Sequence, residues 1–227
     1  MTVAVVTGAS RGIGRAVALA LAERGFALAL PARPSAARAE TEESLRRSGA
    51  SFRFFDCDLA DGAELARVAE LILAERGAPD VLINNAGVIE RAPVAECTDR
   101  SWQHQLDVNL TAPFRLTRAL LPAMLQRGRG RILHVASISA VLGTANQAAY
   151  HASKWGLVGF MKCLAEELTD TGLMTCALLP GSVDTTMLAG SPFAPRMSPE
   201  DVARTLCFYA VDAPLAHNGA VVEMFGT

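Results

Sequence analysis

Short apolar runs alternate with longer amphipathic segments along almost the whole chain of 227 residues. Runs of this kind suit buried strands, and the segments between them have the length and pattern of helices. Strands that alternate with helices predict a parallel sheet with helices on both faces. The predicted strands are residues 3–7, 26–30, 51–57, 81–84, 131–136, 175–179 and 220–225. The pattern therefore predicts an α/β fold, a doubly wound parallel sheet of about seven strands in a single domain spanning residues 1–227.

End signals support the predicted helices, which span residues 13–24, 61–76, 100–126, 147–170 and 198–211. Gly25 and Gly77 follow the first two as C-caps, and Ser198 with Pro199 begins the last. Pro113 lies inside the third helix and predicts a kink there. Residues 180–197, rich in Gly, Pro, Ser and Thr, form the long irregular stretch. A loop of this length in a compact domain predicts a lid or a substrate-binding loop.

Composition limits the classes of partner. Apolar residues make up 51% of the chain, the net charge is −2 and the arginines are scattered, so no nucleic-acid partner is expected. No uncharged apolar run reaches the ~18 residues of a membrane span, and the first residues lack the basic segment of a signal peptide. Five widely spaced cysteines fit buried thiols in a reducing compartment rather than disulfides or a metal site. We expect a soluble cytoplasmic protein without a metal.

A glycine-rich turn joins the first strand to the first helix, with the sequence Thr7-Gly8-Ala9-Ser10-Arg11-Gly12-Ile13-Gly14. Glycines let the backbone approach a pyrophosphate closely, and the helix N-terminus offers free N–H groups. No Gly-Lys-Ser/Thr follows, which excludes a Walker-type loop. The alternative is an ordinary glycine-rich turn. The context predicts a dinucleotide site formed by Gly8, Ser10, Arg11, Gly12, Ile13 and Gly14.

The end of the second strand indicates which dinucleotide binds. NAD sites place an acidic residue there, whereas this strand is followed by Pro31-Ala32-Arg33-Pro34. A guanidinium suits a 2′-phosphate through bidentate geometry, and Arg11 adds a second cation on the same side. We therefore expect NADP (NADPH) in preference to NAD, the alternative being that Arg33 is a solvated loop residue.

Asp58 and Leu59 follow the third strand. The Asp58 carboxylate can accept a hydrogen bond from an adenine amino group, or it can cap the next helix, although Asp61 is the better cap candidate. Both roles stay open on the sequence alone.

Tyr150 and Lys154 are four residues apart, which places both side chains on one face of a helix. A cation beside a phenol favours the phenolate and lowers the phenol's pKa. A tyrosine tuned in this way can exchange a proton with an alcohol or a carbonyl near neutral pH. Ser137 follows the fifth predicted strand, where its hydroxyl could bind the same substrate oxygen.

The order of these motifs resembles that of the short-chain dehydrogenase/reductase family over nearly the whole chain. Besides the glycine turn, the matching segments are Asn84-Asn85-Ala86-Gly87, Asn109, Ser137, Tyr150, Lys154 and Pro180-Gly181-Ser182-Val183-Asp184-Thr185. Each motif is weakly specific, but their combination in this order is very specific. The closest similarity is to 3-oxoacyl-thioester reductases and related carbonyl reductases, and the implied fold is Rossmann-like.

The resemblance implies a role for each matching residue. Tyr150 would act as general acid and base, Lys154 would lower the tyrosine pKa and bind the nicotinamide ribose, and Ser137 would orient the substrate carbonyl. Asn109 would hold a water in the proton relay. The remaining implied cofactor contacts are Asn85, Ala86, Gly87, Pro180, Gly181, Val183 and Thr185, the threonine lying near the nicotinamide.

Several residues keep an alternative. Ser139 competes with Ser137, although the thirteen-residue spacing to Tyr150 favours Ser137. Asn109 could be a plain polar helix residue. Asn84 fits a structural turn residue that tolerates left-handed backbone, and we interpret His151 as a substrate-side or surface residue.

The expected activity is hydride transfer between NADP(H) and a carbonyl or secondary alcohol, with a ketone or a 3-oxoacyl compound as the small-molecule substrate. The alternatives are an NAD-dependent alcohol dehydrogenase and a non-catalytic cofactor-binding module of the same fold. The short loop and the end of the chain soon after the last strand predict an open pocket, or one completed by a partner subunit. Family resemblance also implies a homodimer or homotetramer formed through residues 100–126 and 147–170.

Overall fold

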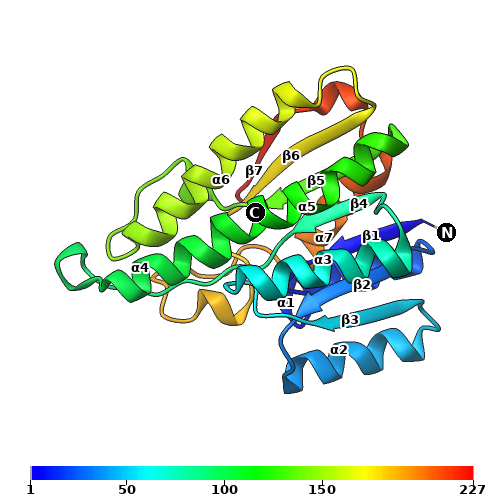
Figure 1. The fold of residues 1–227 in the computed structure, drawn as a ribbon. Helices are drawn as coiled ribbons and strands as arrows, with labels where there is room; N and C mark the ends of the chain where they lie inside the picture. Colours follow the sequence, from blue (N-terminus) through cyan, green and yellow to red (C-terminus); the bar gives the residue numbers. More distant parts are fainter. Residues whose placement is uncertain (1, 227) are drawn as a thin grey trace.

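Seven parallel strands form one sheet in the computed structural model, which describes residues 2–226 (Figure 1). The sheet order is β3-β2-β1-β4-β5-β6-β7. The strands are β1 Val3–Val6, β2 Ala27–Ala32, β3 Phe52–Asp56, β4 Val81–Asn84, β5 Gly130–Val135, β6 Leu173–Pro180 and β7 Ala220–Met224. This arrangement confirms the predicted doubly wound, Rossmann-like parallel sheet.

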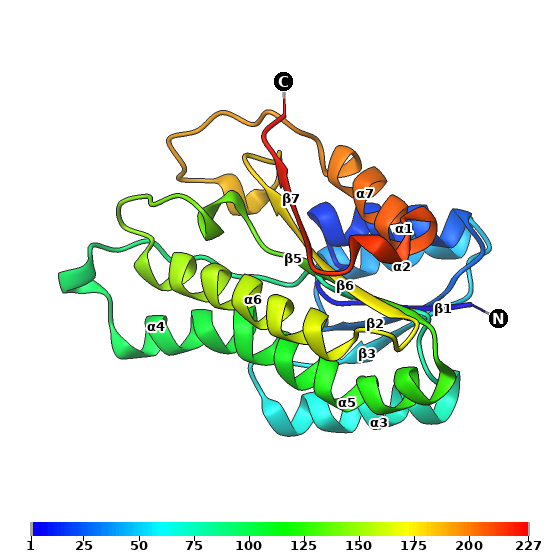
Figure 2. The same cartoon turned by 90° about the horizontal axis from the view of Figure 1, so that it is seen from above.

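Helices cover both faces of the sheet (Figure 2). One layer contains α1 Gly12–Glu23, α2 Ala36–Arg47 and α7 Pro199–Cys207, and the other contains α3 Gly62–Arg76, α4 Asp99–Leu106, α5 Ala112–Arg127 and α6 Ala148–Glu167. Each layer buries its own apolar core against the sheet. Leu21 and Leu206 lie in the first core, and Ile72, Leu120 and Leu164 lie in the second. The sheet is thus covered on both sides, which leaves its strand ends to carry function.

Helix α2 is present in the structure but was not among the helices that the sequence predicted. Its N-cap is Ser35, whose hydroxyl accepts the Arg38 N–H at 3.2 Å. Only Thr41 and Leu45 are buried along its 12 residues, so the segment has almost no apolar stripe. Periodicity therefore gives little signal, and the cap is the feature that could have revealed this helix.

The long helix predicted over residues 100–126 is interrupted. A turn of π-helix, Asp107–Thr111, separates α4 from α5. Pro113 directly follows the π turn, within a run of residues that keep helical backbone angles, so the irregularity predicted at this proline takes the form of a π turn. The π turn carries Asn109, which connects this irregularity with the site.

The carboxyl ends of the strands meet along one edge of the sheet. Strand β1 pairs with β2 on one side and with β4 on the other, so the chain changes direction around it. Open α/β sheets bind ligands outside the carboxyl ends at such a switch point. Within residues 2–226, no helix combines the length and the apolar character needed to cross a bilayer.

Candidate active site

The glycine turn packs against the loop that follows β4. Gly8 has φ +69°, and a Cβ on this residue would lie 2.8 Å from the Ala86 Cα. A side chain at this position would therefore meet backbone as well as adopt a left-handed conformation. Helix α1 begins at Gly12, and its N-cap residue Arg11 makes no side-chain cap. Glycine lets this turn pack closely against the loop after β4, and the N-terminus of α1 presents free backbone N–H groups that fit a pyrophosphate.

Three side chains hold this turn in place. The Thr7 hydroxyl accepts the backbone N–H groups of Asn85 and Ala86 at 3.0 and 3.1 Å. The Asn85 amide donates to the Thr7 carbonyl at 2.9 Å, and the Thr41 hydroxyl donates to the Ser10 carbonyl at 2.9 Å. The Asn85 side chain thus braces the glycine turn, while its neighbours Ala86 and Gly87 line the same edge.

Asn84 ends β4 and is buried. Its backbone is not left-handed, so the interpretation of Asn84 as a turn residue is wrong. Its amide donates to the Thr117 hydroxyl at 3.2 Å and lies 3.4 Å from Nδ1 of His134. Burial lowers the pKa of His134 to about 3, with the charge of Lys154 acting in the same direction. This buried cluster supports β4 and β5 beneath the site with a neutral imidazole.

Arg33 and Asp58 lie side by side at the ends of β2 and β3, with 3.7 Å between Nη1 and Oδ2. Their side chains are 67% and 42% exposed, so both are open to a ligand. Asp61 caps α3 by accepting the N–H groups of Ala63 and Glu64. Asp61 therefore fills the helix-capping role, and hydrogen bonding to an adenine amino group is the role that stays open for Asp58.

The predicted catalytic side chains converge on the carboxyl edge between β4 and β5. Lys154 Nζ lies 5.6 Å from the centre of the Tyr150 ring and donates to the Val135 carbonyl at 2.9 Å. A Cβ placed on Gly87 would lie 3.4 Å from Asn109 Oδ1 and 3.6 Å from Lys154 Nζ. Gly87 thus leaves open a small space beside both polar groups.

Asn109 is fully buried and ties the π turn to two other segments. Its Oδ1 accepts the Val88 N–H at 2.8 Å, and its Nδ2 donates to the Val88 carbonyl at 2.9 Å and to the Ser153 hydroxyl at 3.0 Å. The side chain is therefore engaged with protein atoms on both ends. This makes Asn109 more than a plain polar helix residue.

Both members of the tyrosine–lysine pair are shifted towards their neutral forms. Burial raises the pKa of Tyr150, while a hydrogen bond from Ser137 and the charge of Arg91 act in the opposite direction. Burial also lowers the pKa of Lys154 from 10.5 to about 8. Burial of the phenol outweighs the contributions of Ser137 and Arg91, so the pKa of Tyr150 is raised in this structure; its lowering by Lys154 stays a prediction.

The two candidate serines occupy different places. Ser137 begins the 3-10 turn Ile138–Ala140, and its hydroxyl accepts the Ser139 N–H at 3.1 Å. Ser137 is also the serine that lowers the pKa of the Tyr150 phenol, whereas Ser139 has no effect on it. Of the two serines, Ser137 is therefore the one that acts on Tyr150.

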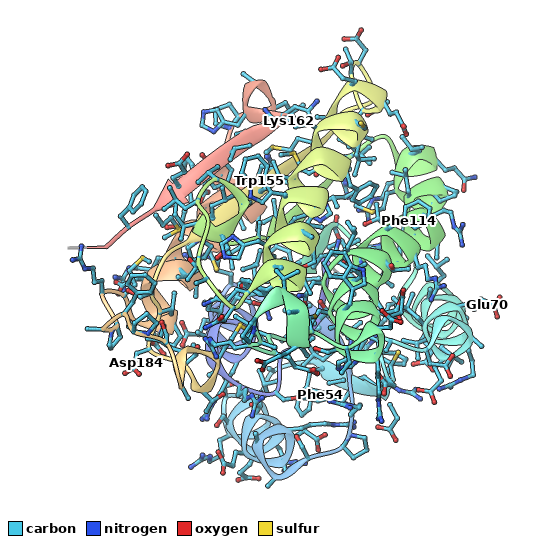
Figure 3. The ribbon with its side chains drawn as sticks, turned by 90° about the vertical axis from the view of Figure 1, so that its left-hand side faces the viewer. Phe54, Glu70, Phe114, Trp155, Lys162 and Asp184 are labelled. Carbon is cyan, nitrogen blue, oxygen red and sulfur yellow. The ribbon has the colours of Figure 1, made fainter. Side chains whose placement is uncertain are left out.

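The loop after β6 closes towards the glycine turn. A Cβ on Gly12 would lie 3.1 Å from Thr185 Cγ2, and the Gly181 N–H donates to the Met224 carbonyl at 2.8 Å. Pro180 ends β6, and buried Val183 pairs with Met197 in an isolated bridge. Figure 3 shows Asp184 on this loop, where its side chain is exposed. The loop of residues 180–197, which we expect to contact cofactor and substrate, therefore lies beside the glycine turn.

Sequence reasoning missed Arg91 and misplaced His151. The Arg91 guanidinium donates from Nη1 to the Ala189 carbonyl at 2.9 Å and from Nη2 to the Met187 carbonyl at 3.3 Å. No motif spacing indicates this contact, which joins two loops almost a hundred residues apart. His151 is buried, and neither ring nitrogen has a partner within the described chain, so the surface alternative for it is wrong.

Among residues 2–226, no group of three or more His, Cys, Asp and Glu side chains is placed to hold a metal ion. The arrangement instead combines a phosphate-sized glycine turn with a phenol, an amine and a hydroxyl on one edge. Such a set can bind a nucleotide and move a proton to or from an oxygen.

Comparison with known proteins agrees with this geometry. The family model described as short chain dehydrogenase matches residues 2–193. The chain is 33% identical over 236 residues to the 3-oxoacyl-(acyl-carrier-protein) reductase FabG of Escherichia coli strain K12, covering 99% of this chain and 96% of that protein.

Two solved structures are also similar. A candidate NAD(P)-dependent gluconate 5-dehydrogenase from Beutenbergia cavernae, with NADP bound at low occupancy, has a TM-score of 0.92 and 37% identity, covering 99% of this chain and 95% of that one. A metagenomic short-chain oxidoreductase in complex with NADP has a TM-score of 0.88 and 36% identity, covering 100% and 97%. Together with the motif order along the sheet edge, these matches confirm the predicted family: this chain belongs to the short-chain dehydrogenases.

Proposed function

We propose that this protein is an NADP(H)-dependent oxidoreductase that interconverts a ketone and a secondary alcohol, with a 3-oxoacyl compound or a related ketone as substrate. The observation that carries the proposal is the convergence of Tyr150, Ser137 and Lys154 with the glycine turn at one sheet edge. The relatives named as 3-oxoacyl reductases support the substrate class.

The residues present fit a phosphorylated dinucleotide. Gly8 and Gly12 allow the tight turn that precedes α1, whose N-terminus would bind a pyrophosphate, and Arg33 offers an exposed guanidinium at the end of β2 for a 2′-phosphate. Asp58, beside Arg33, is placed to accept from the adenine amino group. Two structural neighbours hold NADP, which supports this cofactor over NAD. When bound, NADPH supplies the hydride.

The side chains of this chain handle the substrate oxygen and its proton. Ser137 orients the carbonyl, and Tyr150 donates its phenolic proton in reduction or takes a proton in oxidation. Lys154, with a pKa of about 8, can return a proton to the tyrosine near neutral pH and also holds the nicotinamide ribose. Asn109 keeps the π turn, Val88 and α6 in register around them, and by family resemblance it would hold a water in the relay.

We further propose that the single domain spanning residues 1–227, with residues 180–197 as its substrate loop, acts in the cytoplasm as a homodimer or homotetramer. Large apolar side chains are exposed on the helices expected to pair, including Trp102, Phe114 and Trp155. Figure 3 shows Phe114 and Trp155 on neighbouring helices of the same layer. Such residues exposed on one layer support an interface between copies.

The test is consumption of NADPH with a panel of ketones, diketones and 3-oxoacyl thioesters. We expect turnover by the native protein and its loss in Tyr150→Phe, which keeps nearly all of its NADPH affinity because only the hydroxyl is removed. Tight NADPH binding without turnover of any substrate would favour the non-catalytic module. Equal or better turnover with NADH would favour the NAD-dependent alternative, and substantial activity in Tyr150→Phe would remove the tyrosine from its role.

A further inference from the structure

A pocket of about 370 Å³ opens beside the proposed reaction centre. Its walls come from three loops, residues 91–93 after β4, residues 144–147 before α6, and Gly190 with Pro192 after β6. The first two loops are joined by the Ala92 N–H, which donates to the Asn146 carbonyl at 2.9 Å. This volume suits a small ligand or one end of a longer one.

Arg91 is the one titratable side chain among the residues that line this pocket, all of which the structure describes. Its guanidinium donates to two loop carbonyls, which are neutral acceptors and leave its charge uncompensated. Within residues 2–226, no carboxylate lies within 4.0 Å of it, and its buried Nε has no hydrogen-bond partner. A half-buried guanidinium without a counter-charge is an anion site that its own chain leaves unfilled.

Two segments connect the walls of the pocket with the proposed reaction centre. Gln147 lines the pocket and is the N-cap residue of α6, three residues before Tyr150. Arg91 also holds the Met187 carbonyl, and the Met187 side chain reaches the space beside Gly87 and Lys154. The positive charge of Arg91 also lowers the pKa of the Tyr150 phenol.

We propose that Arg91 is a specificity-determining residue that binds an anionic group of the substrate, so that the preferred substrate is a ketone carrying a carboxylate or a phosphate ester. This inference rests on the proposed carbonyl–alcohol activity of the same site. Carboxylate and phosphate share the planar or bidentate acceptor geometry that a guanidinium matches. The neutral lining of the pocket offers no competing anion, so the charge of Arg91 is available to select among ketones while its hydrogen bonds also hold residues 187–189.

The test measures ligand binding to the protein saturated with NADP⁺, where no hydride can be transferred. Calorimetry compares the affinities of two ligand pairs. The first pair is 3-oxobutanoate and its ethyl ester. The second pair is the 3-oxobutanoyl thioester of 4′-phosphopantetheine and the 3-oxobutanoyl thioester of pantetheine. The first pair reports a carboxylate and the second a phosphate. The variants are Arg91→Gln, Arg91→Lys and the control Arg24→Gln, which makes the same charge change at the C-cap of α1, at the opposite edge of the sheet.

We expect the native protein to bind the anionic member of at least one pair about 10- to 100-fold more tightly than the neutral member, as a charge-assisted hydrogen bond predicts. Arg91→Gln should lose this ratio, Arg91→Lys should keep part of it, and Arg24→Gln should keep all of it. Which pair shows the ratio identifies the source of the anion.

Equal affinity for both members of both pairs in the native protein overturns the inference, and this result needs no variant to fold. Equal weakening of charged and neutral ligands in Arg91→Gln also overturns it, because a side chain that only fastened residues 187–189 would act on both. Failure of the proposed activity has a different signature: the anion preference persists, but NADPH is not consumed with any ketone.

Discussion

Replacing Lys154 with methionine should stabilise the ligand-free protein, although it removes a proposed catalytic group. Burial lowers the pKa of this lysine from 10.5 to about 8. Each pKa unit corresponds to roughly 1.4 kcal/mol, so keeping the ammonium charged inside the protein costs roughly 3 kcal/mol. Methionine has a similar length and carries no charge. It leaves the Val135 carbonyl without the Nζ donor, which costs about 1–2 kcal/mol, so a net gain of about 1–2 kcal/mol is expected near pH 7.

The pH dependence gives the sharper test, because its sign follows from the two protonation states. Below about pH 8 the lysine is charged in the folded and the unfolded chain, and the burial cost is constant. Between about pH 8 and 10.5 only the unfolded chain keeps the proton, so the native protein gains stability as the pH rises. The advantage of Lys154→Met should therefore shrink by roughly 2 kcal/mol between about pH 7 and pH 9.5.

Urea unfolding followed by far-UV circular dichroism at both pH values measures this difference directly. Lys162→Met is the matched control, because Lys162 lies on the same helix but is exposed. Its effect on the free energy of unfolding should not change over this pH range. A stability difference for Lys154→Met that is independent of pH, or a variant less stable than the native protein near pH 7, would refute the reasoning that burial sets the pKa of Lys154.

Three further predictions address the cofactor site, the serine and the turn. Arg33→Ala should weaken NADPH binding about 10- to 100-fold while leaving NADH affinity within a few-fold, measured by fluorescence titration; equal losses for both would argue against a 2′-phosphate contact. Ser137→Ala should lower kcat far more than Ser139→Ala, since only Ser137 acts on the pKa of the Tyr150 phenol; similar losses would contradict the assignment. Gly8→Ala should lower the free energy of unfolding by about 2–4 kcal/mol, because of its φ of +69° and the nearby Ala86 backbone; an unchanged urea midpoint would contradict this.

The parts of the fold that sequence reasoning predicted are those whose signal is local. Buried parallel strands read as apolar runs, and β4 lies where the run of residues 81–84 predicted it. The start of α7 was also predicted, since Ser198 and Asp201 form a capping box that can be read from residue types and spacing. Helix α2 was missed because only Thr41 and Leu45 face the core, so its apolar periodicity is too weak to detect.

The site divides in the same way. Resemblance to the family, through the order of its motifs along the chain, predicted that the glycine turn, Asn109, Ser137, Tyr150 and Lys154 belong to one site. The π turn around Asn109 could not be predicted, since its shift in hydrogen bonding depends on packing against neighbouring segments and not on residue propensity.

The sequence alone determined the fold class and the family, because both rest on the order of short segments along the chain. It also predicted a phosphate-binding turn and the acid–base residues, since each is marked by spacing within a short segment. The tertiary structure decided the properties that depend on what surrounds a side chain. Burial raises the pKa of Tyr150 and brings that of Lys154 to about 8. The folding together of distant loops gives Arg91 its place beside the reaction centre, because contacts between residues so far apart in sequence leave no mark on local pattern.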